Sequence, residues 1–251
     1  GMNGKNKEVI ALLKEAIKIE PRYAQSHNNL GNALKELGDL KNAIKAYQLS
    51  IKLNPKNPQP LYNLGLILKE CGQLDASIKS YEEAINLKND YKEAHLNLAH
   101  SLLLKGDYKR GLLEYEYRLI TKNQSKPHAY PNAKQWSGGK LNKDNKLIVV
   151  SEQGIGDTLQ FMRYINILRD KGIEISFCAL SKLHGIIQES NIDINPISPE
   201  DIDSINGMVW SPLMSLPKHL GVTPNEPIIS SKYIKTKSEL IRKWQNKLEN
   251  I

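Results

Sequence analysis

The sequence predicts a stack of helical hairpins followed by a small domain with a parallel sheet. The first part of this prediction rests on an internal repeat of 34 residues. The second rests on short apolar runs that alternate with helical patterns after residue 145. A chain of 251 residues with 40% hydrophobic content is long enough to bury a core in both parts. The expected fold class is therefore α followed by α/β.

The repeat is visible when the segments that begin at Ala24, Pro58 and Lys92 are aligned. Leucine, glycine and tyrosine then coincide at Leu30, Leu64 and Leu98, at Gly38, Gly72 and Gly106, and at Tyr47, Tyr81 and Tyr115. This pattern resembles the tetratricopeptide repeat family, whose unit is a pair of helices. Each pair leaves an apolar face that only its neighbour can cover, so we expect the units to stack.

The predicted repeat domain covers residues 2–121. It contains a half repeat at 6–23 and full repeats at 24–57, 58–91 and 92–121. The repeats depart from the family pattern at Asn89, Ala99 and Gly111, and we expect none of these changes to break the fold. The glycines at 38, 72 and 106 are expected to end the first helix of each unit.

A polar stripe recurs on the predicted first helices at the spacing of one helical face. Its members are Gln25, Asn29, Asn32, Glu36, Gln59, Asn63, Leu66, Glu70, Glu93, Asn97, His100 and Leu104. The adjacent stripe, which includes Leu30 and Ala33, is apolar and is expected in the core. We therefore expect the polar stripe on the concave side of the stack.

Asparagine recurs at one register of this stripe, at Asn29, Asn63 and Asn97. A primary amide offers a donor and an acceptor together, so it can pair with the backbone of an extended peptide whatever its side chains are. The arrangement resembles the asparagine ladder in the repeats of O-linked N-acetylglucosamine transferases. The predicted peptide site comprises Asn29, Asn32, Asn63, Asn97 and His100. Shared descent of duplicated repeats is the alternative explanation.

Several classes of function are disfavoured. The net charge of +8 is divided between residues 1–122, with 19 basic and 14 acidic residues, and the remainder, with 16 and 13, so it indicates no nucleic-acid partner. Cys71 and Cys178 form no CxxC pair, and His95 and His100 are five residues apart, so no metal site is expected. His27 and His95 are expected to be packing residues. No run of residues is long and apolar enough to span a bilayer.

The second half is predicted in three parts. Residues 122–145 are rich in turn formers and form a connecting segment in which Trp136 docks against one domain. Residues 146–236 alternate strands and helices, with a helix at 157–172 and a weak strand at 192–197, and indicate a small Rossmann-like parallel sheet. Residues 237–251 form an amphipathic C-terminal helix.

A glycine loop, SEQGIGDTLQF, follows the first predicted strand. It is neither GxGxxG nor a P-loop, but its glycines allow close approach of a ligand. Asp157 stands where a helix N-cap belongs, with Gln160 three residues later, so a capping role needs no ligand. From spacing alone we favour the cap over a ligand contact.

The string LIVVSEQGIGDTLQFMRYI, with WSGG before it and MVWSPLMSLPKHLG after it, resembles a group of bacterial proteins related to heptosyltransferases, which are glycosyltransferases of the GT-B fold. The resemblance implies that Asp157 is the base that deprotonates an acceptor hydroxyl. It places Gln153, Gly154, Gly156, Thr158 and Arg163 in a ligand loop on the acceptor side. The second half of the GT-B fold, which supplies most of the nucleotide-sugar site, does not follow in this sequence, so we expect no turnover from the chain by itself.

Two functions follow from these patterns. In the first, a peptide-binding repeat scaffold is joined to the acceptor-side half of a glycosyltransferase, with a sugar or nucleotide sugar as ligand. In the alternative, the chain is a protein–protein interaction module whose α/β domain is structural. Both are consistent with a cytoplasmic protein that needs no cofactor.

Overall fold

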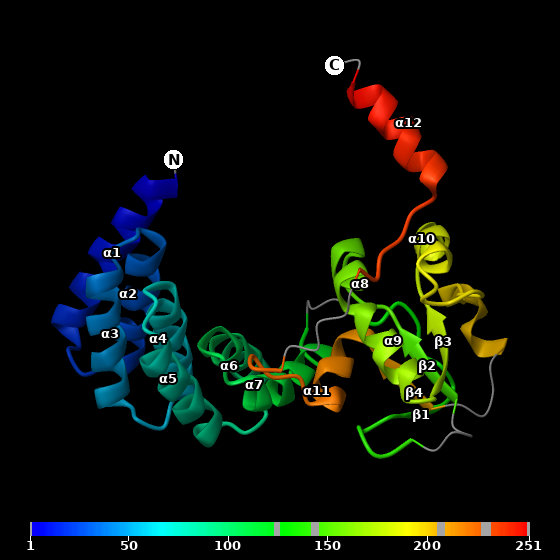
Figure 1. Ribbon diagram of the computed structural model, residues 1–251. Helices are drawn as coiled ribbons and strands as arrows, with labels where there is room; N and C mark the ends of the chain where they lie inside the picture. The colour runs from blue at the N-terminus through cyan, green and yellow to red at the C-terminus, as the bar shows by residue number, and fades with distance from the viewer. Residues whose placement is uncertain (1, 123–125, 142–145, 205–208, 227–231, 250–251) are drawn as a thin grey trace. The chain divides into compact units, whose positions relative to one another are not determined.

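The computed structural model describes residues 2–122, 126–141, 146–204, 209–226 and 232–249. The chain divides into two compact units, Gly1–Thr121 and Lys122–Ile251. Each unit is considered by itself below. Helices α1 to α7 lie in the first unit, and all strands lie in the second (Figure 1).

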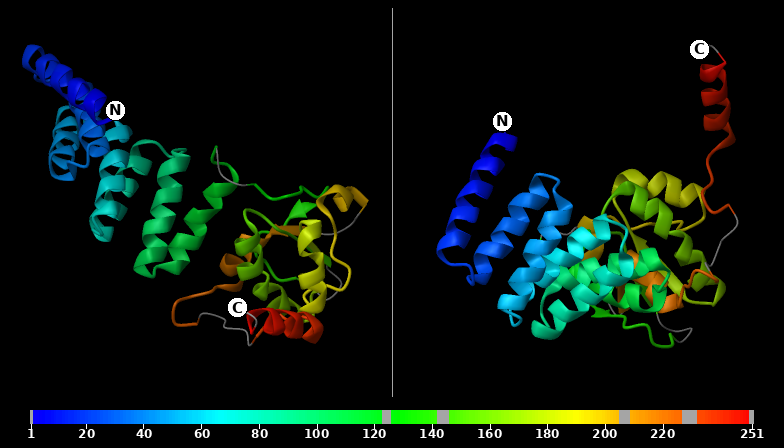
Figure 2. Two further views of the ribbon diagram at one scale, coloured as in Figure 1. Left: turned by 90° about the horizontal axis from the view of Figure 1, so that it is seen from above. Right: turned by 90° about the vertical axis from the view of Figure 1, so that its left-hand side faces the viewer.

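The first unit is a series of helices stacked in chain order (Figures 1 and 2). The helices are α1 (Met2–Ile19), α2 (Ala24–Glu36), α3 (Leu40–Leu53), α4 (Pro58–Glu70), α5 (Leu74–Leu87), α6 (Lys92–Lys105) and α7 (Tyr108–Glu114). Helices α2, α4 and α6 are the first helices of the three repeats, and α3, α5 and α7 are the second. The predicted array of helical hairpins is therefore present.

Two sets of glycines shape the hairpins of the first two repeats, and only the set at the ends of the first helices recurs in the third. Gly31 lies against the buried ring of Tyr47, and a Cβ atom at this position would come within 2.5 Å of the ring. Gly65 meets Tyr81 in the same way in the second repeat, at 2.6 Å. Gly106 has a φ of +91°, a left-handed conformation that glycine adopts without strain, and it caps α6. The repeating glycines and tyrosines therefore lock the two helices of a unit together.

The third repeat differs from the other two in its second helix. Helices α3 and α5 have 14 residues each, whereas α7 has seven and continues as the 3₁₀ helix η1 (Tyr115–Leu119). Tyr115 therefore lies in η1, although it aligns with tyrosines of regular helices. Arg118 of η1 is fully buried, where its guanidinium donates to the carboxylate of Glu116 at 2.8 Å.

The second unit contains a four-stranded parallel sheet with the order β1-β4-β2-β3. The strands are β1 (Lys134–Gln135), β2 (Lys146–Val150), β3 (Glu174–Cys178) and β4 (Val209–Pro212). The segment predicted as a connection thus contributes an edge strand. The weak strand expected at 192–197 is reduced to a single bridge between Cys178 and Ile197.

The two faces of the sheet are covered differently. Leu147, Val149 and Phe177 pack under helices α9 (Arg163–Asp170), α10 (His184–Glu189) and α11 (Leu216–Leu220). On the other face, Ile148, Val150 and Trp210 pack with Ala129 and with Ile202. Ile202 belongs to the 3₁₀ helix η3 (Pro199–Ser204), so the second face is covered mainly by irregular chain. Trp136 packs against the first face, as predicted.

Three short elements complete the second unit. They are helix α8 (Ile155–Phe161) and the 3₁₀ helices η2 (Ser181–Leu183) and η4 (Leu213–Ser215). The single helix expected at 157–172 is divided near Met162 into α8 and α9. The predicted C-terminal helix is α12 (Ser238–Leu248), in which no residue is buried.

Candidate functional site

The predicted polar stripe lies on the first helices and is largely solvent-accessible. Its exposed members are Gln25, Asn29, Glu36, Gln59, Glu70, Glu93, His100 and Leu104. The adjacent apolar stripe is buried or half-buried, with Ala33 in the core and Leu30 half-buried. Helices α2, α4 and α6 therefore share one largely polar face, which we call the amide face and define by the twelve stripe residues named in the sequence analysis.

Asn63 is buried in the middle of the amide face and joins the first two repeats. Its Nδ2 donates to Oδ1 of Asn28 and to Oδ1 of Asn32, both at 3.1 Å. Its own Oδ1 accepts from Nε2 of Gln59 at 3.1 Å. Asn32 also accepts from the hydroxyl of Tyr47 at 2.7 Å. Both N–H donors of Asn63 are thus used within the protein.

Asn97 makes the corresponding connection one repeat later. Its Nδ2 donates to the hydroxyl of Tyr62 at 3.3 Å and to the carbonyl of Glu93 at 2.9 Å. Its Oδ1 accepts from Nζ of Lys69 at 2.9 Å. Burial lowers the pKa of Lys69, while the neighbouring carboxylate of Glu70 acts in the opposite direction. This asparagine therefore also joins two first helices.

Asn29 is different, because it is exposed. Its Oδ1 accepts from Nε2 of Gln25 at 2.9 Å, and its Nδ2 donates no hydrogen bond to any residue that the structure describes. The structure thus brings the three asparagines onto one face, as expected from their register, and gives them unequal surroundings. Sequence reasoning missed the partners Asn28, Gln59, Tyr62 and Lys69, because they lie outside the repeated asparagine register.

His100 lies on the exposed side of α6, near the ring of Tyr115 at a centroid distance of 5.9 Å. Burial against its neighbours, and then the charge of Lys69, hold the pKa of His100 below its ordinary value. A neutral imidazole at physiological pH can both donate and accept a hydrogen bond. His100 is therefore suited to a neutral polar ligand such as a peptide backbone.

His27 and His95, which were predicted to be packing residues, are buried and bond to the backbone. Nε2 of His27 lies 2.8 Å from the carbonyl oxygen of Pro21, and Nε2 of His95 lies 3.0 Å from that of Asn89. His95 also contacts Glu114 through Nδ1 at 2.6 Å and stacks on Tyr117. Within the described residues, no group of three or more His, Cys, Asp or Glu could hold a metal ion.

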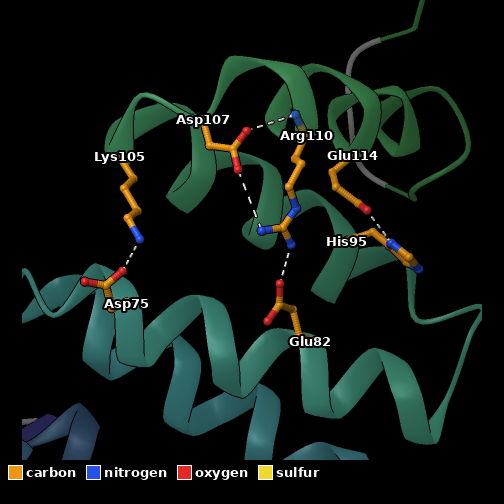
Figure 3. A network of polar contacts seen from close by, with 7 residues as sticks. All are labelled: Asp75, Glu82, His95, Lys105, Asp107, Arg110 and Glu114. Atoms are coloured by element: carbon orange, nitrogen blue, oxygen red, sulfur yellow. Dashed lines mark hydrogen bonds and ion pairs between the residues drawn. The ribbon is translucent and has the colours of Figure 1, made fainter.

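Ion pairs join the second and third repeats on the side shown in Figure 3. Lys105 contacts Asp75, and Arg110 contacts Glu82, while Asp107 accepts from the backbone N–H of Arg110 at 3.2 Å. These side chains are largely exposed, so each pair contributes little stability by itself. They align α5 with α6 and α7 and leave the amide face to other residues.

The glycine loop connects β2 to α8 at the carboxyl edge of the sheet. Gln153 has a φ of +60°, a left-handed conformation that is uncommon for a residue with a side chain. The N-cap of α8 is Gly154, and Asp157 is the third residue of the helix. The prediction that Asp157 is itself the N-cap is therefore wrong, because the helix begins earlier in the chain. Its carboxylate still caps the helix, since Oδ2 accepts from the backbone N–H of Gly154 at 3.1 Å.

The other predicted ligand-loop residues are bonded within the unit. The buried hydroxyl of Thr158 donates to the carbonyl of Gly154 at 3.1 Å. Arg163 donates to the carbonyl of Gln160 at 2.7 Å and to the hydroxyl of Tyr233 at 3.1 Å. Gly156 is exposed, and a Cβ atom there would meet nothing within 4 Å. The loop is thus well ordered by its own contacts.

Glu152 is a buried carboxylate that sequence reasoning missed. It directly follows Ser151 at the end of β2, and its Oε1 accepts from the backbone N–H of Met214 at 2.9 Å. The hydroxyl of Ser151 forms a hydrogen bond with Nδ1 of His128, with 2.8 Å between the two atoms. No pattern in the sequence indicates that Glu152 contacts Met214, because the two residues are 62 positions apart.

Comparison with known proteins identifies the first unit. Three overlapping stretches, residues 3–38, 31–70 and 65–106, match the family model described as TPR repeat. Residues 3–106 are tetratricopeptide repeats. No curated protein matches the chain.

Solved structures similar to this chain include other repeat proteins. A crystal structure of MamA protein is 25% identical, covers 46% of this chain and 63% of its own, and has a TM-score of 0.43. MamA 41-end from Desulfovibrio magneticus RS-1 is 19% identical, with coverages of 45% and 64% and a TM-score of 0.42. The second TPR of Spaghetti (RPAP3), bound to an HSP90 peptide, is 20% identical, with coverages of 40% and 94% and a TM-score of 0.39. The chain thus spans less than two thirds of the length of the first two.

Proposed function

We propose that the protein is an interaction scaffold whose tetratricopeptide repeats hold an extended peptide on the amide face. The observation that supports this best is that α2, α4 and α6 each place exposed polar side chains on the same face, which are Gln25, Asn29 and Glu36, Gln59 and Glu70, and Glu93 and His100. An extended peptide can follow such a face and bond to it at each repeat.

The contacts divide the predicted residues into two roles. Asn29 has an exposed amide, Asn32 has an Nδ2 that donates to no described residue, and His100 is exposed and held neutral. These three are proposed to contact the peptide backbone. Asn63 and Asn97 use both N–H donors within the repeats, so they are proposed to set the spacing between first helices.

The test is selection of peptides on the immobilised chain, followed by titration of a selected peptide against variants. Asn29→Ala should weaken binding about fivefold, because one hydrogen bond contributes about 1 kcal/mol. Asn86→Ala is the matched control, since Asn86 is an exposed asparagine on the second helix α5. Equal affinity of the wild-type chain, of Asn29→Ala and of His100→Ala would show that the peptide binds elsewhere.

A second proposal concerns the glycine loop. Oδ1 of Asp157 makes no hydrogen bond to a described residue, and the side chain is only half-buried. This oxygen is available to accept a proton from an acceptor hydroxyl, the role that the resemblance to heptosyltransferases implies. In this proposal the second unit is the Rossmann-like, acceptor-side half of a bacterial, cytoplasmic glycosyltransferase, and its ligand is a sugar. In the alternative, the capping bond is the whole role of Asp157 and the unit is structural.

Asp157→Asn separates these two alternatives. Asparagine keeps an oxygen for the N–H of Gly154, so the fold should be retained, but it cannot act as a base. In a form of the protein that carries a nucleotide-sugar-binding half, the variant should bind the donor and lose transfer. Undiminished transfer by the variant would leave Asp157 with its capping role alone.

A further inference from the structure

The C-terminal helix α12 is amphipathic and has no buried face. Leu240, Ile241, Trp244 and Leu248 are 46%, 45%, 59% and 67% exposed. At 100° per residue these four side chains share one side of the helix, with no polar residue between them. Large apolar side chains gathered in this way on a soluble surface indicate a contact with another body.

The segment that contains α12 is strongly basic. Residues 232–249 contain six basic and two acidic residues, a net charge of +4, which is half the excess of the whole chain. The basic residues are Lys232, Lys235, Lys237, Arg242, Lys243 and Lys247. This segment therefore carries the whole positive excess of the second unit.

The contacts of the segment leave most of this charge available. Lys237 pairs with Glu189 at 3.1 Å, and the backbone N–H of Lys235 donates to Oγ of Ser190 at 2.9 Å, so the start of α12 is attached to α10. In the portion of the chain that the structure covers, Arg242, Lys243 and Lys247 form no ion pair. Lys247 lies over the ring of Trp244, 5.0 Å from its centroid, beside the apolar side.

We propose that α12 binds to an anionic phospholipid surface, lying in the interface with Leu240, Ile241, Trp244 and Leu248 among the acyl chains. Strong amphipathicity, low overall hydrophobicity, tryptophan on the apolar side and lysine or arginine elsewhere are the properties of interfacial helices. The net positive charge selects an anionic surface over a zwitterionic one. A nucleic acid would engage the basic side chains and leave the four apolar ones in water, which makes it the poorer match.

This mode of binding does not require a helix that spans the membrane. Among the described residues, no helix combines the length and apolar character that crossing a bilayer requires. An interfacial helix needs neither, because it lies parallel to the surface and buries only one side. The helix would attach the second unit to the surface reversibly, since a single short helix has limited apolar area.

The experiment is co-sedimentation of the 251-residue chain with vesicles of phosphatidylcholine alone or with phosphatidylglycerol added. We expect binding only to the anionic vesicles, and weaker binding as salt is raised. Each cation near the surface contributes about fivefold to affinity, so R242Q/K243Q/K247Q should reduce binding about 100-fold. L240S/W244S should abolish it. The charge-matched control is K41Q/K45Q/K52Q, in which three exposed lysines of α3 are replaced and binding should be unchanged.

Four results would overturn the proposal. The first is equal binding of the wild-type chain to both kinds of vesicle, or to neither. The second is loss of binding in the charge variant but not in L240S/W244S, which would mean adsorption by charge alone. The third is binding of duplex DNA through the same residues without vesicle binding. The fourth is a dimer, detected by light scattering and removed by L240S/W244S, in a chain that ignores vesicles. All variants lie on exposed positions, and their thermal unfolding would confirm that they fold.

Discussion

Single asparagines at one register of the repeats differ in what they contribute to stability. We expect Asn63→Ala to lower the free energy of unfolding by about 2 kcal/mol, because two hydrogen bonds to the preceding repeat are lost, one of them buried, and Oδ1 of Asn28 is left without its donor. Asn29→Ala should change it by less than about 0.5 kcal/mol, because the side chain is exposed. Urea unfolding of the two variants measures the difference.

These two variants control for each other, since the substitution and the helix position are the same. Similar unfolding midpoints would mean that the bonds between repeats contribute nothing, and that Asn63 is free to bind a peptide. The sequence predicted the register of the asparagines correctly. It could not predict their partners, because the bonds cross between helices at an offset of 35 residues rather than within the aligned positions.

The two cysteines should also behave differently. Burial raises the pKa of the Cys178 thiol to about 12, and the carboxylates of Glu200 and Asp201 act in the same direction. Because the thiolate is the reactive form, Cys178 should not react with a thiol reagent at pH 8, whereas the exposed Cys71 should. Titration should therefore count one thiol in the native protein and two in denaturant. Two fast-reacting thiols in the native protein would contradict the buried position of Cys178.

Pairs of helices depend on the close approach of a glycine to a tyrosine. Gly31→Ala places a methyl group 2.5 Å from the buried ring of Tyr47, so overpacking should exceed the gain in helix propensity. We expect a net loss of about 1–2 kcal/mol in the free energy of unfolding. Gly185→Ala on α10 is the control, because a Cβ atom there meets nothing within 4 Å and the change should be neutral or stabilising. Equal losses at both positions would show that the contact with Tyr47 is not responsible.

The carboxylate of Glu152 connects β2 to η4. Its replacement by Ala leaves the buried N–H of Met214 without an acceptor, so we expect a loss of about 1–3 kcal/mol. Glu152→Gln keeps an acceptor oxygen and should lose less, and thermal unfolding compares the two. If alanine and glutamine are tolerated equally, Glu152 does not hold η4 in place.

Sequence patterns with a clear period predicted their helices and strands correctly, whereas segments without a period did not. Helices α2 to α6 follow from the 34-residue period, and β2 and β3 from their apolar runs. The prediction of one continuous helix at 157–172 is wrong at Met162, where a turn separates α8 from α9. No glycine or proline in the sequence marks this break. Strand β1 has two residues, which are too few to show any period. It forms because it pairs with β4, next to which the backbone N–H of Trp136 donates to the carbonyl of Trp210.

The molecule consists of two units that each have their own core. We expect a fragment of residues 1–121 to fold alone, because tetratricopeptide repeats are stabilised by contacts with neighbouring repeats. Circular dichroism should show cooperative loss of helix close to the helical transition of the whole chain. An unfolded fragment would show that the repeats require the second unit. The composition and the repeat predicted this division, whereas the exact role of residues 126–141 depended on long-range contacts such as that of Ala129 with the sheet.

The side-chain amides of Asn63 and Asn97 both donate hydrogen bonds to the preceding repeat. Asn63 bonds to Asn28 and Asn97 bonds to Tyr62, each with a residue 35 positions earlier, so the second and third repeats each carry the group that attaches them to the repeat before. A second copy of residues 58–91 inserted after position 91 would therefore find all its partners already in place. Its asparagine would meet the Tyr62 and Lys69 of the original copy, and Asn97 would meet those of the new one. The array can thus be lengthened one unit at a time, by gene duplication or by design, without inventing a new joint.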